Sequence, residues 1–227
     1  MLKKRIIPTL LWKNFGLVKG KKFDSWRRVG TVLPSIKIYN SRDVDELFLL
    51  DINATIENRG PDEQSIKSFS SECSVPFCVG GGINSIEQIR KTLISGADKI
   101  VINQAAYLDK KFVSQAVKTF GSSTITISID TKKIDDKYYC FYNNGKINSG
   151  KEIIEWISEL EDLGIGEILI NSIDRDGSRL GYDIDLLNIV TSNVSVPVIA
   201  CGGVGNVTHF VDGIINGNCQ AVAAANI

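Results

Sequence analysis

The sequence predicts an α/β protein built as a closed (β/α)8 barrel of parallel strands. Two observations support this fold class. Short, almost entirely apolar segments rich in β-branched residues alternate with helical patterns, and the segments of the first half recur in the same order in the second half. Apolar strands are typical of a parallel sheet that is covered on both faces. Four strand–helix units occurring twice make eight strands, which a closed barrel requires and an open sheet does not.

The eight predicted strands are short and bounded by turn or cap residues. They are Arg5–Leu11, Glu46–Ile52, Val75–Val79, Lys99–Ile102, Thr124–Asp130, Glu167–Asn171, Pro197–Cys201 and Gln220–Ala224. Helices are predicted between them. Asn84 with Glu87, and Ser149 with Glu152, have the spacing of capping boxes, which mark helix starts. After the fifth strand, residues 132–150 instead predict a β-hairpin that turns at the Asn-Gly segment "NNG".

The two halves of the sequence resemble each other segment by segment. "DELFLLDINAT" resembles "GEILINSIDRD", "VPFCVGGGI" resembles "VPVIACGGV", and "SGADKIVIN" resembles "NGNCQAVAA". This alignment places Glu46 opposite Glu167. It also places Asp130, at the end of the fifth strand, opposite Leu11, at the end of the first.

The repeat predicts a single TIM-barrel domain over residues 1–227, with half-barrels of about 1–120 and 121–227. The first half follows its fourth strand with a helix near Asp109–Phe120, whereas the second half ends at Ile227 without one. We therefore expect the helix that closes the barrel to be missing from this chain.

The composition excludes several classes of protein. Lys plus Arg and Asp plus Glu each number 26, so no net charge attracts nucleic acid or a membrane surface. No apolar segment reaches the roughly 20 residues of a membrane helix. Five cysteines without CxxC spacing and a single histidine, His209, do not predict a metal site. Reduced thiols in a cytoplasmic protein are expected.

Two glycine-rich turns follow strands three and seven, at the barrel end where active sites lie. Gly81 and Gly82, and in the repeat Gly202 and Gly203, allow backbone N–H groups to approach an anion. Such glycines can also simply relieve crowding between a strand and the next helix. The two symmetric copies favour binding of a ligand that is phosphorylated at both ends.

Four carboxylates follow strand ends at the same edge: Asp51, Asp130, Asp174 and Asp176. Carboxylates around an apolar mouth are candidates for general acid/base catalysis. Aspartates in loops also commonly bind nearby backbone N–H groups. We assign Asp51 and Asp174 to this loop role, favour Asp130 as the chemical group, and leave Asp176 open to either role.

Four charged residues begin strands at the opposite end of the predicted barrel: Arg5, Glu46, Lys99 and Glu167. Charges at strand starts are usually only solvated. Their alternating sign across strands one, two, four and six nevertheless permits a closed ring of salt bridges.

Several segments resemble a known family. "KRIIP", "VGGGI", "IDTKK", "NSIDRDGSRLGYD" and "GGVGNVTHF" resemble the cyclase subunit of imidazole glycerol phosphate synthase, one of the phosphate-binding TIM barrels of histidine biosynthesis. The resemblance implies a glutaminase that docks on the strand-start face and releases ammonia into the barrel. It implies that ammonia then attacks a doubly phosphorylated ribulosyl-aminoimidazole carboxamide nucleotide, giving imidazole glycerol phosphate and an aminoimidazole carboxamide ribotide. It implies no cofactor.

The resemblance assigns roles residue by residue. The ammonia gate would consist of Arg5, Glu46, Lys99 and Glu167, with Asp98 at the partner interface. Catalytic positions of the family match Lys19, Asp130 and Asp176. Phosphate binding would fall to Gly81, Gly82, Asn103, Gly177, Gly202, Gly203, Ala224 and Ala225.

The departures from the family lie at the strand ends. The family's acid/base pair comes from strands one and five, and the strand-one aspartate is Leu11 here. Hydroxyls of the family are replaced at Gln104, Asn171 and Ala225. Losing one acid/base group typically costs about 10²–10⁴ in rate. The sequence alone therefore favours a chain that still conducts ammonia but serves another acceptor.

The segments "PTLLWKNFGLVKG" and "FDSWRRVGTVLP" look like a divergent branch tied to sugar amidation in bacterial surface-polysaccharide synthesis. In that branch the barrel resembles a conduit between a glutaminase and an ATP-using sugar amidotransferase. The main expectation is thus an ammonia-channelling synthase subunit. One alternative is a working cyclase in which Asp176 or Asp51 replaces the carboxylate missing at position 11. Another is a non-catalytic scaffold.

Overall fold

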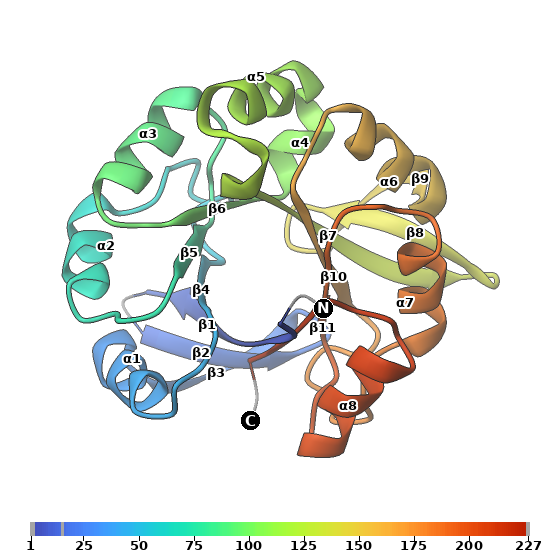
Figure 1. The fold of residues 1–227 in the computed structure, drawn as a ribbon, viewed down its shortest axis with the longest axis horizontal. Helices are drawn as coiled ribbons and strands as arrows, with labels where there is room; N and C mark the ends of the chain where they lie inside the picture. The colour runs from blue at the N-terminus through green and yellow to red at the C-terminus, as the bar shows by residue number, and fades with distance from the viewer. Residues whose placement is uncertain (1–2, 15, 226–227) are drawn as a thin grey trace.

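The computed structural model describes residues 3–14 and 16–225 and has the predicted closed barrel (Figure 1). Its parallel strands are β1 (Arg5–Lys13), β4 (Leu47–Asp51), β5 (Phe77–Gly80), β6 (Lys99–Ile102), β7 (Ile125–Ile134), β10 (Glu167–Ser172), β11 (Val198–Cys201) and β12 (Ala221–Ala224). Each strand pairs in parallel with the next one in this order, and β12 pairs with β1. This last pairing closes the sheet.

The helices form a ring outside the strands (Figure 1). They are α1 (Val32–Asn40), α2 (Glu63–Ser70), α3 (Ile86–Ile94), α4 (Gln104–Leu108), α5 (Lys110–Phe120), α6 (Ile153–Asp162), α7 (Ile184–Thr191) and α8 (Val207–Ile215), with a 3-10 turn at Ser122–Thr124. Within the described ranges no helix is long and apolar enough to cross a bilayer. The last described element is β12. The prediction that no closing helix follows it concerns residues 226 and 227, which lie outside the described residues.

The two predicted capping boxes are wrong. The N-cap of α3 is Ser85, whose hydroxyl accepts from the backbone N–H of Gln88, so this helix starts one residue later than predicted. Ser149 and Glu152 lie in a strand, because Glu152 still pairs across to the neighbouring strand and α6 begins only after it. The spacing of Ser149 and Glu152 in the sequence could not show that this segment pairs with a neighbouring strand.

The barrel interior is a core of its own. One apolar cluster comes from the inward faces of the strands: Ile7, Phe48, Cys78, Val101, Leu169, Ile199, Ala221 and Ala223. Strand β7 contributes no apolar residue to this cluster, but its polar residues Thr126 and Ser128 are also buried. A second, larger cluster fills the space between strands and helices. This two-layer packing explains why the strands are apolar on both faces.

Antiparallel hairpins extend the barrel after β1 and after β7. The first is β2 (Gly16–Lys21) with β3 (Asp24–Gly30), and the second is β8 (Lys137–Tyr142) with β9 (Ile147–Glu152). The predicted turn at 143–145 joins β8 to β9. Because β2 pairs with β1 and β8 with β7, both parent strands are longer than predicted. Each half-barrel thus carries an antiparallel hairpin after its first strand.

The strand register supports the alignment of Leu11 with Asp130. Leu11 lies beside Leu50 in the pairing of β1 with β4, and Asp130 lies beside Asn171 in the pairing of β7 with β10. Leu50 and Asn171 are equivalent in the repeat. Leu11 therefore occupies in the first half-barrel the position that the carboxylate occupies in the second.

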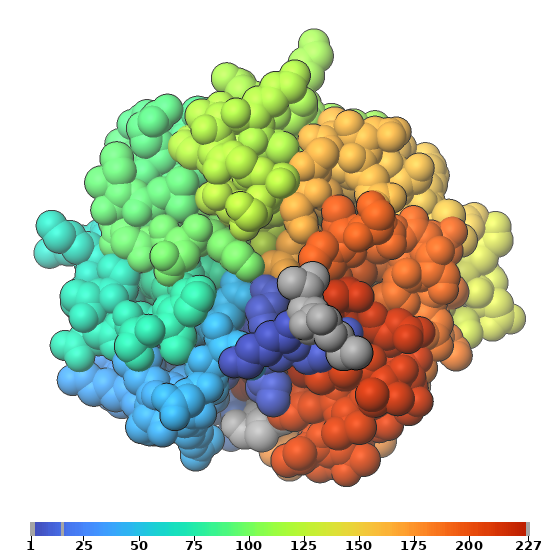
Figure 2. All heavy atoms as spheres, viewed as in Figure 1, coloured from blue at the N-terminus to red at the C-terminus, as the bar shows by residue number. Residues whose placement is uncertain are grey.

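The seam between the two ends of the chain is closed. Lys4 Nζ donates to the Cys219 carbonyl at 2.7 Å, and the Arg5 N–H donates to the Gln220 carbonyl at 3.3 Å. Figure 2 shows the blue N-terminal segment lying against the red C-terminal segment near the centre of the face shown.

Candidate active site

A cavity of about 200 Å³ lies at the C-terminal ends of the strands. A smaller cavity of about 30 Å³ adjoins it, and four residues line both: Leu11, Asp176, Cys201 and Ala225. The two cavities therefore form one continuous site. This is the end of the barrel where the sequence placed the chemistry.

The two glycine turns lie in different parts of this site. Gly81 and Gly82 line the larger cavity, and Gly202 and Gly203 line the smaller one. Glycine is required here by packing, since a Cβ on Gly82 would lie 2.0 Å from the Arg59 carbonyl oxygen. All four residues also have positive φ angles, which favour glycine. Relief of crowding therefore accounts for the glycines, and it still leaves their backbone beside the cavity.

The other predicted phosphate-binding residues divide in the same way. Gly177 and Ala224 line the smaller cavity, Asn103 lines the larger one, and Ala225 lines both. The Asn103 amide nitrogen donates to the Ser128 carbonyl and to Asp130 Oδ2, at 3.0 Å each. This side chain therefore orients the Asp130 carboxyl.

Asp130 is the group best suited to proton transfer. Only 7% of the residue is exposed, and burial raises the pKa of its carboxyl to about 7. The hydrogen bond from Asn103 acts against this rise, and the charge of Asp176 adds to it. A carboxyl with a pKa near neutrality can both accept and return a proton at physiological pH.

Asp176 is a second carboxylate on the wall of both cavities. Burial raises its pKa, which a hydrogen bond from the Phe23 N–H to Oδ2, at 3.1 Å, partly opposes. Its Oδ1 has no hydrogen-bond partner among the residues described. Asp176 is therefore available for chemistry, which the sequence had left open.

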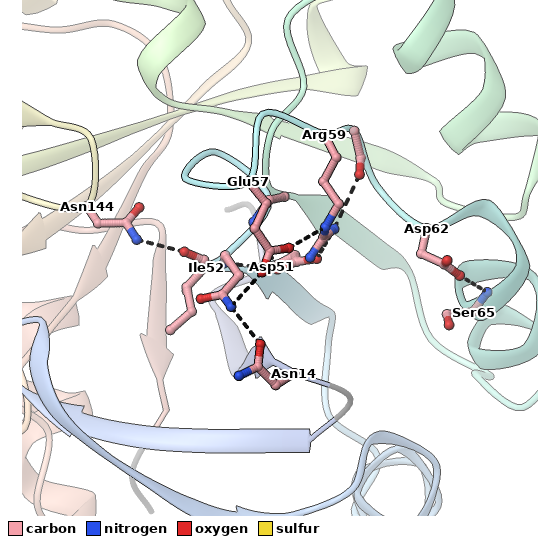
Figure 3. A network of polar contacts seen from close by, with 11 residues as sticks. Asn14, Asp51, Ile52, Glu57, Arg59, Asp62, Ser65 and Asn144 are labelled. Atoms are coloured by element: carbon pink, nitrogen blue, oxygen red, sulfur yellow. Dashed lines mark hydrogen bonds and ion pairs between the residues drawn. The ribbon is translucent and has the colours of Figure 1, made fainter.

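Asp51 and Asp174 have the loop role that the sequence assigned to them. Asp51 Oδ1 accepts from the N–H groups of Asn53 and Ala54, and its Oδ2 pairs with Arg59 at 2.6 Å. Figure 3 shows Asp51 and Arg59 pointing toward each other. Asp174 Oδ2 accepts from the Lys133 N–H at 2.9 Å. Both carboxylates are therefore occupied.

Several cavity residues were not identified from the sequence. Phe23 and Trp26 come from the first hairpin, Arg59 from the β4–α2 loop, and Asn144 from the β8–β9 turn. The Asn144 amide donates to the Ile52 carbonyl at 2.7 Å, which ties the second hairpin to that loop (Figure 3). The sequence signals were weak, because an aromatic or amide in a hairpin does not indicate the direction in which the hairpin folds.

The predicted ring of charges is present at the strand-start end. Arg5 pairs with Glu46 at 2.6 Å and also with Glu167, and Lys99 pairs with the same two glutamates at 3.0 and 3.3 Å. Burial acts to lower the pKa of Lys99, but the two glutamates outweigh it and raise that pKa. The four residues therefore form one closed network.

The two remaining predicted site residues lie at opposite ends of the barrel. Lys19, on β2, lines the smaller cavity, and burial together with the charges of Arg27 and Arg179 lowers its pKa. Asp98 is exposed at the strand-start end, where its Oδ2 accepts from the Phe77 N–H at 2.8 Å. Its role in binding a partner stays a prediction.

The buried Asp130 carboxyl should make stability depend on pH. Its folded pKa, about 7, lies above the unfolded value near 4, so the folded state retains the proton more strongly. Wild-type stability should fall as the pH rises from about 4 to 7. Asp130→Asn should therefore gain up to about 4 kcal/mol over wild type at pH 8, and the gain should vanish near pH 4. Urea unfolding of both proteins at the two pH values measures it, and a difference independent of pH would contradict the assignment.

Comparison with known proteins supports a relationship over the whole chain. The family model described as "Histidine biosynthesis protein" matches residues 5–227. The chain is 41% identical over 227 residues to the imidazole glycerol phosphate synthase subunit HisF of Chlorobium limicola. It is also 41% identical to that of Chloroherpeton thalassium and 39% identical to that of Chlorobaculum tepidum. Each alignment covers 100% of this chain and 90% of the relative.

Proposed function

This chain belongs to the histidine biosynthesis protein family, and on that premise we propose that it is the cyclase subunit of an imidazole glycerol phosphate synthase. It would act in the cytoplasm beside a glutaminase subunit. The observation that carries the proposal is Asp130, whose pKa of about 7 suits it to proton transfer on the wall of the larger of two adjoining cavities, each lined by one glycine turn. The charged ring at the other end of the barrel supports the proposal that ammonia enters the barrel there.

Ammonia would reach Asp130 through the barrel. In this proposal the glutaminase docks on the strand-start face, near Asp98, and ammonia passes the ring formed by Arg5, Glu46, Lys99 and Glu167. Beyond the ring, the buried hydroxyls of Thr126, Ser128 and Thr9 offer polar partners among apolar neighbours. A small uncharged molecule can be transferred between such groups without exposing the barrel core to ions.

At the cavity, Asp130 would take a proton from ammonia as its nitrogen bonds to the ribulosyl nucleotide. The reaction also needs a second proton-transfer group, which Leu11 cannot supply. Asp176 fits this role better than Asp51, since Asp51 is held by Arg59 and two backbone N–H groups. The cyclase activity would thus rest on Asp130 and Asp176.

A second candidate function is favoured by Leu11 itself. The barrel would conduct ammonia to a different acceptor, for which we propose a nucleotide-linked sugar bound to an ATP-using amidotransferase. Leu11 lines the cavity at the position equivalent to Asp130, and Gln104 and Ala225 line it where the family resemblance implied hydroxyls. These three differences would weaken both proton transfer and phosphate binding in the cyclase reaction.

Leu11→Asp distinguishes the two candidates. The experiment supplies saturating ammonium salt and the ribulosyl nucleotide, without glutaminase, and follows formation of imidazole glycerol phosphate. If the chain is a cyclase that uses Asp176, wild type should turn over at about 1 per second or faster, and Leu11→Asp should change the rate only a few fold. If only Leu11→Asp reacts, the cyclase proposal fails and ammonia delivery to another acceptor is supported.

A further inference from the structure

The two hairpins at the mouth of the barrel, where the parallel strands end, lie beside surfaces of opposite charge. Residues 13–30, which include the first hairpin, contain six basic residues and one acidic residue, Asp24, although the whole chain has 26 of each kind. The basic residues are Lys13, Lys19, Lys21, Lys22, Arg27 and Arg28. Within the part of the chain that the structure describes, none of the six forms an ion pair or a side-chain hydrogen bond. We call residues 13–30 the basic hairpin.

An acidic cleft borders the second hairpin. It has a volume of about 590 Å³ and lies between the β7–β8 turn and the start of α7. Its wall contains one lysine, one arginine and five aspartates, namely Asp135, Asp136, Asp174, Asp183 and Asp185. Asp174 follows the end of β10, so the cleft opens at the same end of the barrel as the basic hairpin. Figure 1 shows the two hairpins at different positions around the ring.

Each of these surfaces is electrostatically unfavourable for an isolated chain. Burial together with the charges of Arg27 and Arg179 lowers the pKa of Lys19 on the basic hairpin. In the acidic cleft, burial and the Asp183 carboxylate, which accepts a hydrogen bond from the Tyr138 hydroxyl at 2.8 Å, raise the pKa of Tyr138. Like charges therefore act on one another on both surfaces. A surface of opposite charge would offset this repulsion.

The basic hairpin also ends in an open strand edge. β3 pairs with β2 alone, and six of its seven residues are exposed. Val29 on this strand is 40% exposed, and Leu180 in the β10–α7 loop is 72% exposed. Proteins usually cover such an edge or protect it with charge. Here the positive charge protects the edge against a neutral or basic chain, whereas it attracts an acidic surface.

We propose that two copies of this chain associate mouth to mouth, with the basic hairpin of each copy in the acidic cleft of the other. The chain itself supplies the complementary surface, so a second copy is the occupant that the charges favour. A two-fold axis makes the contact twice, once in each direction, and the assembly closes at two copies. Nucleic acid fits less well, because the aspartates at the same mouth would repel its phosphates.

The association would cover the entrance to the site. Phe23 and Trp26 belong to the basic hairpin and line the larger cavity. A second copy seated on this hairpin therefore lies over that cavity. The glutaminase proposed above would dock at the opposite end of the barrel, so the two contacts do not compete. The association is independent of the proposed function, because it is measured without nucleotide or ammonia.

Sedimentation of the wild-type chain tests the association directly. We expect a dimer at about 50 mM salt and a monomer at about 0.5 M salt, because salt screens exposed charges. Hydrogen exchange at the lower salt concentration should be slowed in residues 16–30 and 132–138, which are the two surfaces in contact. A chain that is monomeric at both salt concentrations, or that forms assemblies larger than two copies, would overturn the proposal.

A charge swap identifies the surfaces. Lys22→Glu with Arg27→Glu reverses the charge of the basic hairpin at two exposed positions. Asp135→Asn with Asp185→Lys reverses the charge of the cleft, and asparagine tolerates the φ of 46° at position 135. Each double variant should self-associate at least about tenfold more weakly than wild type, because like charges then face each other. An equimolar mixture should recover the dimer, since both of its contacts again join opposite charges.

Lys111→Glu with Lys118→Glu is the matched control. Both lysines are exposed on α5, outside the two surfaces, and the pair changes the net charge by the same amount as the hairpin variant. This control should dimerise like wild type. Circular dichroism shows that each variant is folded before its mass is compared. Equal weakening in the control, or a mixture of the two folded swap variants that stays monomeric, would overturn the proposal.

Discussion

Replacing Asp130 by asparagine is expected to lower ammonia-dependent turnover by about 10²–10⁴-fold. Asparagine keeps the shape of the side chain and can still accept the hydrogen bond from the Asn103 amide, which is 3.0 Å from Asp130 Oδ2. It cannot take up or return a proton. Initial rates with saturating ammonium salt and the ribulosyl nucleotide measure the effect without requiring a glutaminase.

The pH profile gives an independent measure of the same group. If Asp130 acts as the general base, it must be ionised, so the wild-type rate should rise through a pH of about 7 when the concentration of uncharged ammonia is held constant. Asp174→Asn is the matched control, because that carboxylate accepts a hydrogen bond from the Lys133 N–H and lines neither cavity. Turnover within tenfold of wild type in Asp130→Asn would remove Asp130 from the mechanism.

Replacing Arg5 by methionine should destabilise the protein by about 3 kcal/mol. The change leaves Glu46 and Glu167, which are 2% and 6% exposed, with Lys99 as their only remaining cation in the ring. An unpaired buried carboxylate is costly because neither water nor a partner compensates its charge. Urea unfolding at pH 7 measures the loss.

Lys3→Met is the control for this experiment. Lys3 pairs with Asp45 at 2.6 Å near the same end of the barrel, but its side chain is 82% exposed, so its loss should change stability little. The functional counterpart is a comparison of nitrogen sources. In Arg5→Met, turnover with glutamine and a glutaminase should fall more than turnover with ammonium salt. Equal losses would argue against a gate.

The sequence determined the fold of this protein to a large extent. Alternation of strands and helices, together with the internal repeat, was sufficient to predict the closed barrel, because both are properties of local order along the chain. The repeat also identified Leu11 as the counterpart of Asp130, and the strand register agrees with it. The alternating signs of Arg5, Glu46, Lys99 and Glu167 only permitted a ring, which the family resemblance implied and the salt bridges show.

The tertiary structure decided which groups are available for chemistry. The sequence could not assign a pKa of about 7 to Asp130, because that value depends on burial and on the distances to Asn103 and Asp176. It could not show that the charges of Arg27 and Arg179 act on Lys19 and lower its pKa, since the three residues come from two strands of a hairpin and a distant loop. Desolvation and charge interactions are set by distances in space, whereas periodicity and repeats are set by distances along the chain.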